Sequence, residues 1–585
     1  YIFQDTGLTK FKLRKLELNS VENMSSMFHG CSKLKEVIMP EFDLNGFTDM
    51  SYMFADDDLL EFVDLSNLKT NKVTNMKGLF KGCRNLGTIN LGGSFDTSQV
   101  TDMSLMFDNC KSIKKLNLST FNTKSVKYMN CMFRECSSLV SLDVANFNTV
   151  NVEDMCDLFF GIKVKFLSLS WNTRNVKIMK QMFGYLTEVE VIDLNTSFDT
   201  SQVINMEGMF VGCYNLKNID VSNFNTTNVE SFKDFVKGCS WLESLDVSHF
   251  VTSKAKDMGG IFNGCSQLFS LNLKSFDTAQ VTNMQNMFNG CCNLYSLEFN
   301  NDKFITSKVT NMKGMFHNCM HLWSLDISSF DTSNVEDMSM MFSGMFQLES
   351  IDVSNFRTDK VTDMYQMFAD LMVTNIEVSN FNTEACIDTS EMFMNWGKIT
   401  NLDLYNFNTK KVRRMDWMFS GCKNLETING LDIFDTSFVQ DVSNMFKDCL
   451  NLREIKLGVN FKVAEAEQLN GMFSGCSAIT EVDLSNFETR YVRDMGHMFY
   501  DCKNLKNIKI DKALFITRNV ESMNDMFWGC NSLTFFDFSG FDTSSVKSMD
   551  RMFYSCITFE EIDISSFDTT NLVMMNQMFY NCQNL

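Results

Sequence analysis

Cysteine is the residue type whose number and spacing in this chain could do the most chemistry. Sixteen of the 20 cysteines lie three residues after a recurring position that is Phe in all but one of these cases: Cys31, Cys83, Cys110, Cys136, Cys213, Cys239, Cys265, Cys291, Cys319, Cys422, Cys449, Cys476, Cys502, Cys530, Cys556 and Cys582. Such a column could ligate metal ions or form a ladder of disulfides. However, one thiol per copy supplies no Cys-x-x-Cys pair, and six copies carry another residue there, among them Asp57 and Trp396. We therefore predict small, buried, reduced structural thiols, with metal ligation and some disulfides as alternatives.

Acidic residues recur at a second position of the repeat and so form a second column along the copies. Each lies between the apolar residues of a short alternating segment. The candidate binding face consists of Asp143, Asp193, Asp220, Asp246, Asp326, Asp352 and Asp403. The pattern places these carboxylates on the strand face opposite to the flanking leucines. Like charges on adjacent strands repel, so the column must be solvated, screened or bridged by cations. A solvated face that keeps the protein soluble is the first interpretation, and a face that binds a ligand or Ca²⁺ is the alternative.

Histidines and glycines offer no catalytic pattern. The five His are scattered, and His317-x-x-x-His321 has no partnering Glu, so we predict no metal site there. The sequence also shows neither a phosphate-binding glycine loop nor a nucleophile elbow. We predict that the protein is not an enzyme and needs no cofactor.

One repeated unit must position all of these residues. A Met-Phe step recurs from Phe28 to Phe579 in 22 copies, with Val236 in the Phe position of one copy, and the mean period is near 26 residues. A fixed period of this length is typical of solenoids, in which each unit buries its apolar face only against its neighbours.

The apolar spacing changes once within each unit. In one copy Leu271 and Leu273 flank Asn272, as in a short strand, whereas Val281, Met284, Met287 and Phe288 follow at steps of three and four, as in a helix. The fold class predicted is an α/β solenoid, leucine-rich-repeat-like, of about 22 stacked units of short strand, turn and short helix.

The predicted helix carries recurring end signals. Asp or Asn precedes the first Met as a potential N-cap in Asn75, Asp102, Asp154, Asn205, Asp257, Asn283, Asn311, Asp337, Asp363 and Asp494. Two residues after the Phe position, 19 of the 22 copies carry Gly, Asn or Asp. These residues tolerate the left-handed conformation best, so we expect the helix to end there.

The repeat fills almost the whole chain of 585 residues. We expect residues 1–20 to form a degenerate first repeat, with Leu16-Glu17-Leu18 as its strand, and residues 21–585 to form one continuous, elongated solenoid with uncapped ends. Two columns, after the strand and at the Met-Phe step, hold 40 of the 56 Phe. We predict that their rings stack from copy to copy as the core.

Charge and hydropathy exclude several function classes. The formal net charge is −20 and Lys and Arg form no cluster, so nucleic acid is not an expected partner. An anionic membrane surface is disfavoured for the same reason. The sequence has no apolar run long enough for a transmembrane helix.

The motif Leu-Asp-Val-Ser-x-Phe-x-Thr-x-x-Val-x-x-Met-x-x-Met-Phe-x-Gly-Cys-x-x-Leu resembles the bacterial-surface-protein 26-residue repeat of the BspA-like leucine-rich repeat proteins. The copy from Leu325 to Leu348 reproduces it with only Ile327 for Val and Met345 for Cys. The resemblance implies a leucine-rich-repeat-like solenoid, surface display, and adhesion or ligand binding.

Two functions follow as hypotheses. The first is an extracellular or cell-surface adhesin that binds a protein or glycan on another surface. The alternative is a structural fibre or coat component, on a cell or a virion, that assembles with copies of itself through its uncapped ends or lateral faces.

Overall fold

A computed structural model describes residues 3–12, 21–39 and 46–585 of the chain. Two compact units divide the chain, Tyr1–Val281 with Gly290–Lys303 and Thr282–Asn289 with Phe304–Leu585. The strand predicted at Leu16–Leu18 lies outside the described residues. The structure does show Phe3 stacked on Phe28 at 5.4 Å between ring centroids.

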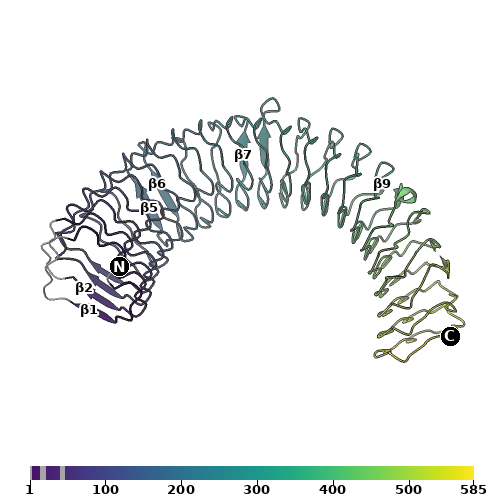
Figure 1. Cartoon of the computed structure of the whole chain (residues 1–585). Coiled ribbons are helices and arrows are strands. Elements are labelled where there is room, and N and C mark those ends of the chain that lie inside the picture. The colour runs from purple at the N-terminus through teal and green to yellow at the C-terminus, as the bar shows by residue number, and fades with distance from the viewer. Residues whose placement is uncertain (1–2, 13–20, 40–45) are drawn as a thin grey trace. The chain divides into compact units, whose positions relative to one another are not determined.

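Short parallel strands join successive copies. They are β1 (Lys10–Lys12), β2 (Glu36–Ile38), β3 (Phe62–Asp64), β4 (Thr88–Asn90), β5 (Phe166–Leu169), β6 (Val191–Leu194), β7 (Ser270–Leu273), β8 (Ser296–Phe299), β9 (Asn401–Asp403), β10 (Thr427–Asn429), β11 (Glu481–Leu484) and β12 (Asn507–Ile510). β1 to β4 form one sheet in chain order, and the others pair two by two, each with the strand of the next copy. Within each unit the copies lie side by side as successive loops of the chain (Figure 1). The solenoid part of the fold prediction is confirmed.

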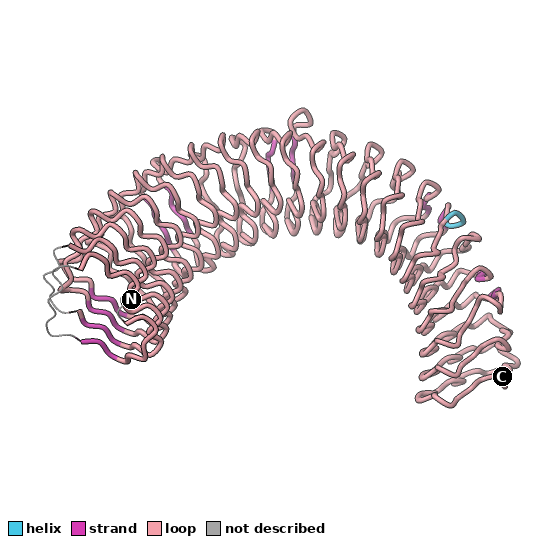
Figure 2. The backbone as a smooth tube through the Cα atoms, in the orientation of Figure 1, coloured by secondary structure: helices cyan, strands magenta, loops and turns pink. Residues whose placement is uncertain are grey.

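The short helix predicted in each copy is wrong, and so is the α/β class. Within the described residues the one helix is the 3₁₀ turn η1 (Leu431–Ile433), and turns fill most of each copy (Figure 2). We call the stretch from the first Met of a copy to the residue two after its Phe the turn segment. None of the described helices has the length and apolar character to cross a membrane.

Hydrogen bonds to the next copy replace helical ones in the turn segment. In one copy the amides of Met338, Met340 and Phe342 donate to the carbonyls of Asp363, Tyr365 and Met367, at 2.7–3.1 Å. The amide of Gly344 continues the ladder to Ala369. Alternate N–H groups therefore point along the solenoid axis, and the fold is a β-solenoid rather than a stack of helices.

Residues with a left-handed backbone conformation (positive φ) produce this alternation of N–H directions. Gly344 has φ +76°, and Met340, two residues before the Phe, has φ +57°. The left-handed conformation predicted two residues after each Phe is confirmed, but it follows a tight turn instead of a helix. The ten predicted N-cap residues do accept hydrogen bonds from the backbone N–H two residues on, as Asp337 does from Ser339 at 2.9 Å.

Stacked phenylalanines form the core, as predicted. Phe342 is fully buried, and its ring lies 5.9 Å from that of Phe316 and 5.8 Å from that of Phe368, nearly parallel to both. The second column stacks in the same way, for example Phe95 on Phe121 at 6.2 Å. Each copy thus covers the apolar surface of its neighbour.

The cysteine column has a hydrogen-bonding role. All 16 thiols donate to the main-chain carbonyl at the Phe position of the preceding copy, at 2.9–3.2 Å, as Cys449 does to Phe419. Burial raises the pKa of thiols in this column such as those of Cys110 and Cys449, and raises the pKa of Cys136 to about 12, because the apolar surroundings disfavour a thiolate. A buried Thr column acts similarly: the Thr332 hydroxyl donates to the Arg357 carbonyl and accepts from the Arg357 amide.

Candidate functional site

The seven aspartates of the predicted binding face are all solvent-exposed. Six of them, all except Asp193, accept a hydrogen bond from the backbone N–H two residues on, at 2.9–3.1 Å. Asp193 instead accepts from the Ser168 hydroxyl of the neighbouring strand at 2.9 Å. The Ser222 hydroxyl and amide hold the pKa of Asp220 below its usual value. These six aspartates therefore close the turn that follows the short apolar alternation of each copy.

Neutral and basic residues interrupt this column. Asp403 pairs with Asn429 and Asp483 pairs with Lys509 in the strand registers. Lys274, the residue directly after β7, forms an ion pair at 2.7 Å with Glu298 of β8. The like-charge repulsion expected along the column is thereby reduced. No group of three or more His, Cys, Asp or Glu suited to a metal ion occurs in the part of the chain that the structure describes.

Two troughs lie instead on another face of the repeat, which we call the turn face. It consists of the side chains two residues before and one and two residues after each Phe of the Met-Phe step. The first trough, in the first unit, has a volume of 720 Å³ and is lined by Asp56, Lys81, Gly82, Asp108, Asn109, Lys111, Arg134, Glu135, Asp157, Phe160 and Gln181.

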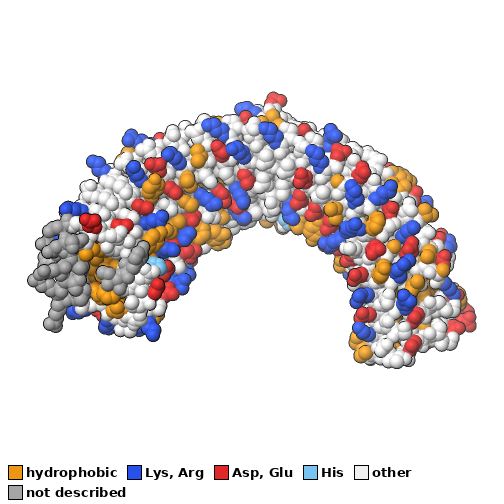
Figure 3. Space-filling view, viewed as in Figure 1, with side chains coloured by type: hydrophobic (Ala, Val, Ile, Leu, Met, Phe, Trp, Pro, Cys, Tyr) orange, Lys and Arg blue, Asp and Glu red, His pale blue; other side chains and the backbone are white. Residues whose placement is uncertain are grey.

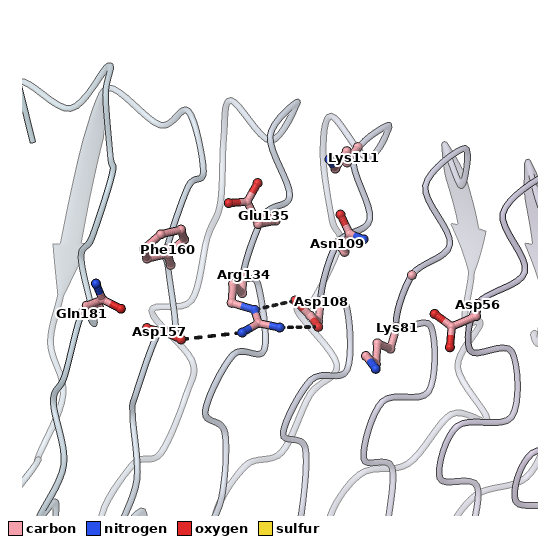
Figure 4. Close-up of a pocket in the computed structure, with 11 residues that line it drawn as sticks. Asp56, Lys81, Asp108, Asn109, Lys111, Arg134, Glu135, Asp157, Phe160 and Gln181 are labelled. Atoms are coloured by element: carbon pink, nitrogen blue, oxygen red, sulfur yellow. Dashed lines mark hydrogen bonds and ion pairs between the residues drawn. The ribbon is translucent and has the colours of Figure 1, made fainter. Parts of the chain in front are cut away.

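Arg134 occupies the middle of the first trough (Figure 4). Its Nε and Nη2 donate to both carboxylate oxygens of Asp108, at 2.8 and 3.0 Å, and Nη1 lies 3.7 Å from Asp157. The Asp108 side chain is only 3% exposed, so the carboxylate of this bidentate pair is desolvated, and its two hydrogen bonds fix the geometry of the guanidinium. Burial raises the pKa of Asp157, although Arg134 opposes the shift. The trough thus has a rigid, mixed-charge floor.

The second trough, in the second unit, also has a volume of 720 Å³. Its wall is more aromatic: Tyr500 stacks on Trp528 at 4.5 Å, and Trp528 on Tyr554 at 5.6 Å. Lys447 lies over the Trp417 ring at 4.8 Å, and Arg551 binds the buried Asp525 at 2.9 Å. Stacked Tyr and Trp next to Arg are the residue types on which binding energy concentrates in protein interfaces.

Sequence reasoning missed the turn face because it treated this segment as a helix. A signal was present in the differences between copies. The Met before the Phe and the Phe itself hardly vary, whereas the residue after the Phe changes from copy to copy: Lys81, Asp108, Arg134 and Phe160 in the first trough, and Lys447, Ser474, Tyr500, Trp528 and Tyr554 in the second. Packing of the core does not constrain the residue type at these positions, so their side chains can be suited to binding a ligand.

The geometry defines a β-solenoid repeat protein with an exposed, variable face. The chain belongs to the family described as "Mycoplasma protein of unknown function, DUF285", whose model matches residues 1–92, 84–195, 187–301, 292–402, 391–513 and 507–585. A search of the curated proteins finds no match.

Among solved structures, similar chains include leucine-rich repeat proteins. One from Eubacterium ventriosum is 15% identical with a TM-score of 0.32, over 59% of this chain and 85% of that one. One from Bacteroides ovatus is 14% identical with a TM-score of 0.16, over 95% and 88%. A leucine-rich cell surface protein from Faecalibacterium prausnitzii is 12% identical with a TM-score of 0.17, over 86% and 82%.

Proposed function

We propose that this protein is a non-enzymatic surface protein whose turn face binds a partner on another surface and so mediates adhesion. The observation that carries the proposal is the coincidence of the two troughs with the positions that vary between copies. A core position keeps its residue because each copy must pack on the next. A variable face on a fixed scaffold is the arrangement expected of a binding protein.

The experiment compares adhesion of three forms of the full chain to a panel of cell types and to a glycan array. A turn-face variant carries Lys81→Ala, Glu135→Ala, Trp417→Ala and Tyr554→Ala. A strand-face variant carries Asp220→Lys, Asp246→Lys, Asp326→Lys and Asp352→Lys. We expect the turn-face variant to lose at least tenfold in binding while the strand-face variant retains it. The reverse result would mean that the partner binds the aspartate column instead of the turn face. Equal binding by all three forms would mean that neither face binds it.

The Ca²⁺ predicted for the aspartate column stays a prediction with its own test. If cations bridge neighbouring carboxylates, millimolar calcium should raise the melting temperature more than a monovalent salt of matched ionic strength, since a ligand that binds only the folded state stabilises it. Asp220→Asn with Asp246→Asn, two aspartates at this position in successive copies, should reduce the difference. Equal shifts of the melting temperature from both salts would mean that calcium acts only by screening charge and does not bridge the carboxylates.

A further inference from the structure

A run of glycines sets one part of the turn face apart from the rest. Two residues after the Phe position, four successive copies carry Gly212, Gly238, Gly264 and Gly290, and no other two successive copies both carry Gly there. All four have φ between +70° and +77°, and the last three are partly exposed to solvent. We call Gly238, Gly264 and Gly290, which all belong to the first unit, the glycine strip.

The glycine strip is bare backbone, whereas an isolated glycine at this position is covered. A Cβ at Gly344, for example, would lie 2.4 Å from Oδ1 of Asn318 in the preceding copy, whose side chain fills that space. A Cβ at Gly264 would instead lie 3.4 Å from the Cα of Gly238, and one at Gly290 would lie 3.5 Å from the Cα of Gly264. No side chain in the described part of the first unit comes within 4 Å of either position.

Exposed aromatic side chains follow the glycines in the same four copies. They are Tyr214, Trp241, Phe269 and Tyr295, each between 43% and 58% exposed. A ring carbon of Tyr214 lies 3.4 Å from the Cβ position of Gly238, so this ring borders the strip. Phe269 and Tyr295 stack with 5.6 Å between ring centroids. On the side shown in Figure 3, hydrophobic side chains reach the surface in groups between charged ones, and such groups mark binding sites.

The polar side chains of these copies are largely uncharged where they border the strip. At the turn-face positions of the four copies the only charged residues are Asp234 and Lys237, and these two form an ion pair at 3.2 Å. Asn263 supplies an amide on the turn face. Next to the aromatic side chains the Asn293 amide donates to Gln267 at 3.0 Å. Aromatic rings with a few neutral hydrogen-bonding groups suit an uncharged ligand.

An extended peptide does not fit the strip as an added strand. The amide of Gly212 donates to the Lys237 carbonyl at 2.7 Å, and the amide of Gly238 donates to the Asn263 carbonyl at 2.6 Å. These N–H groups already bind the next copy, so they have no proton to offer a second backbone. A sugar ring needs no such ladder, because its C–H groups pack against aromatic rings and its hydroxyls exchange hydrogen bonds with amide side chains.

Resting on the proposed function, which makes the turn face the binding face, we infer that the glycine strip and its aromatic side chains bind a neutral glycan chain of the partner surface. Sugar rings lie over the bare backbone of the strip and contact the aromatic side chains, including Trp241. Asn263 and Gln267 contact the hydroxyls. Because no net charge is involved at the contact, binding should change little with salt concentration.

The test is isothermal titration of the full chain with neutral hexasaccharides of glucose, mannose, galactose and N-acetylglucosamine, and with the anionic hexasaccharide of hyaluronan. Gly264→Asn places a side chain on the strip. The fold should tolerate it, because Asn109 has φ +62° at the equivalent position. Trp241→Ser removes one aromatic side chain. The matched controls are Gly161→Asn, at an isolated glycine of the same unit, and Phe166→Ser, at an exposed aromatic residue of β5.

We expect at least one neutral hexasaccharide to bind, each strip variant to weaken its binding at least tenfold, and each control to weaken it less than twofold. Absence of binding by every neutral hexasaccharide would overturn the inference. Weakening by the controls as large as that by the strip variants would also overturn it, as would tighter binding of the hyaluronan hexasaccharide than of all the neutral ones. Melting temperatures of the variants confirm that each remains folded.

The adhesion assay separates this inference from the proposed function. Adhesion that the turn-face variant loses, yet that Gly264→Asn and Trp241→Ser both retain, would keep the function and overturn the glycan site. Hexasaccharide binding that these two variants lose, by a chain that adheres to none of the cell types, would support the glycan site and overturn the adhesion function.

Discussion

Phe342→Ala is expected to lower the free energy of unfolding by about 3–5 kcal/mol, the range for truncating a buried aromatic side chain. The ring is fully buried and lies between the rings of Phe316 and Phe368, so its removal leaves a cavity bordered by two other copies. Copies of a solenoid are stabilised by contacts with their neighbours. Weakening one such contact should let the two sides unfold separately, so the unfolding transition should also broaden or split. Urea unfolding followed by circular dichroism measures both effects.

Phe346→Ala is the matched control in the same copy. This side chain is 40% exposed, and a surface truncation of this kind should change the free energy of unfolding by no more than about 0.5 kcal/mol. An equal loss from both substitutions would mean that the Phe column does not hold the copies together.

Asp57→Asn is expected to stabilise the protein, and increasingly so as the pH rises from about 4 to about 9. Asp57 replaces a column cysteine and is fully buried. Its Oδ1 accepts the Cys31 amide at 2.7 Å, while Oδ2 is buried with no hydrogen-bond partner. Burial raises the pKa of this carboxyl to about 9, so the folded protein keeps a proton that the unfolded chain loses near pH 4.

The direction of this pH dependence follows from the difference between the pKa of Asp57 in the folded protein and in the unfolded chain. An acid whose pKa is raised on folding contributes its full stability below the unfolded pKa and loses it as pH rises toward the folded pKa. Each unit between the two values corresponds to roughly 1.4 kcal/mol, so the gain from Asn at neutral pH should reach several kcal/mol. Asn keeps an acceptor for Cys31 and supplies N–H donors without a charge. Urea unfolding at pH 4.5, 6, 7.5 and 9 measures the trend, and a constant difference between the two proteins would contradict a buried, neutral Asp57.

The period and the core could be predicted from sequence because they depend on residues that repeat. The stacked phenylalanines follow from columns of one residue type, and the left-handed position two residues after each Phe follows from the recurrence of Gly, Asn and Asp there. The helix was wrong because two successive tight turns space Val335, Met338, Met341 and Phe342 as a helix does. Gly78, Gly208, Gly260, Gly314 and Gly471, two residues before the Phe, are evidence against a helix interior, and they mark the second left-handed position that the structure shows.

The site was less predictable for a physical reason. A binding face is made by differences between copies, and a consensus motif removes these differences. Asp448, Ser474 and Tyr500 each occupy turn-face positions that other copies fill differently, and only the stacking of copies brings them together. The aspartate column was conspicuous because it repeats, and much of its repetition is explained by the turn that six of the seven carboxylates close.

Site-specific photo-crosslinking tests the central claim most directly. A photoreactive phenylalanine analogue is placed at Tyr554 on the turn face or at Tyr405, which is 56% exposed beside β9, and each protein is irradiated on the cells that bind it in the adhesion assay. A turn face that binds the partner predicts crosslinked adducts from position 554 and few or none from position 405. Adducts from position 405 alone would contradict it.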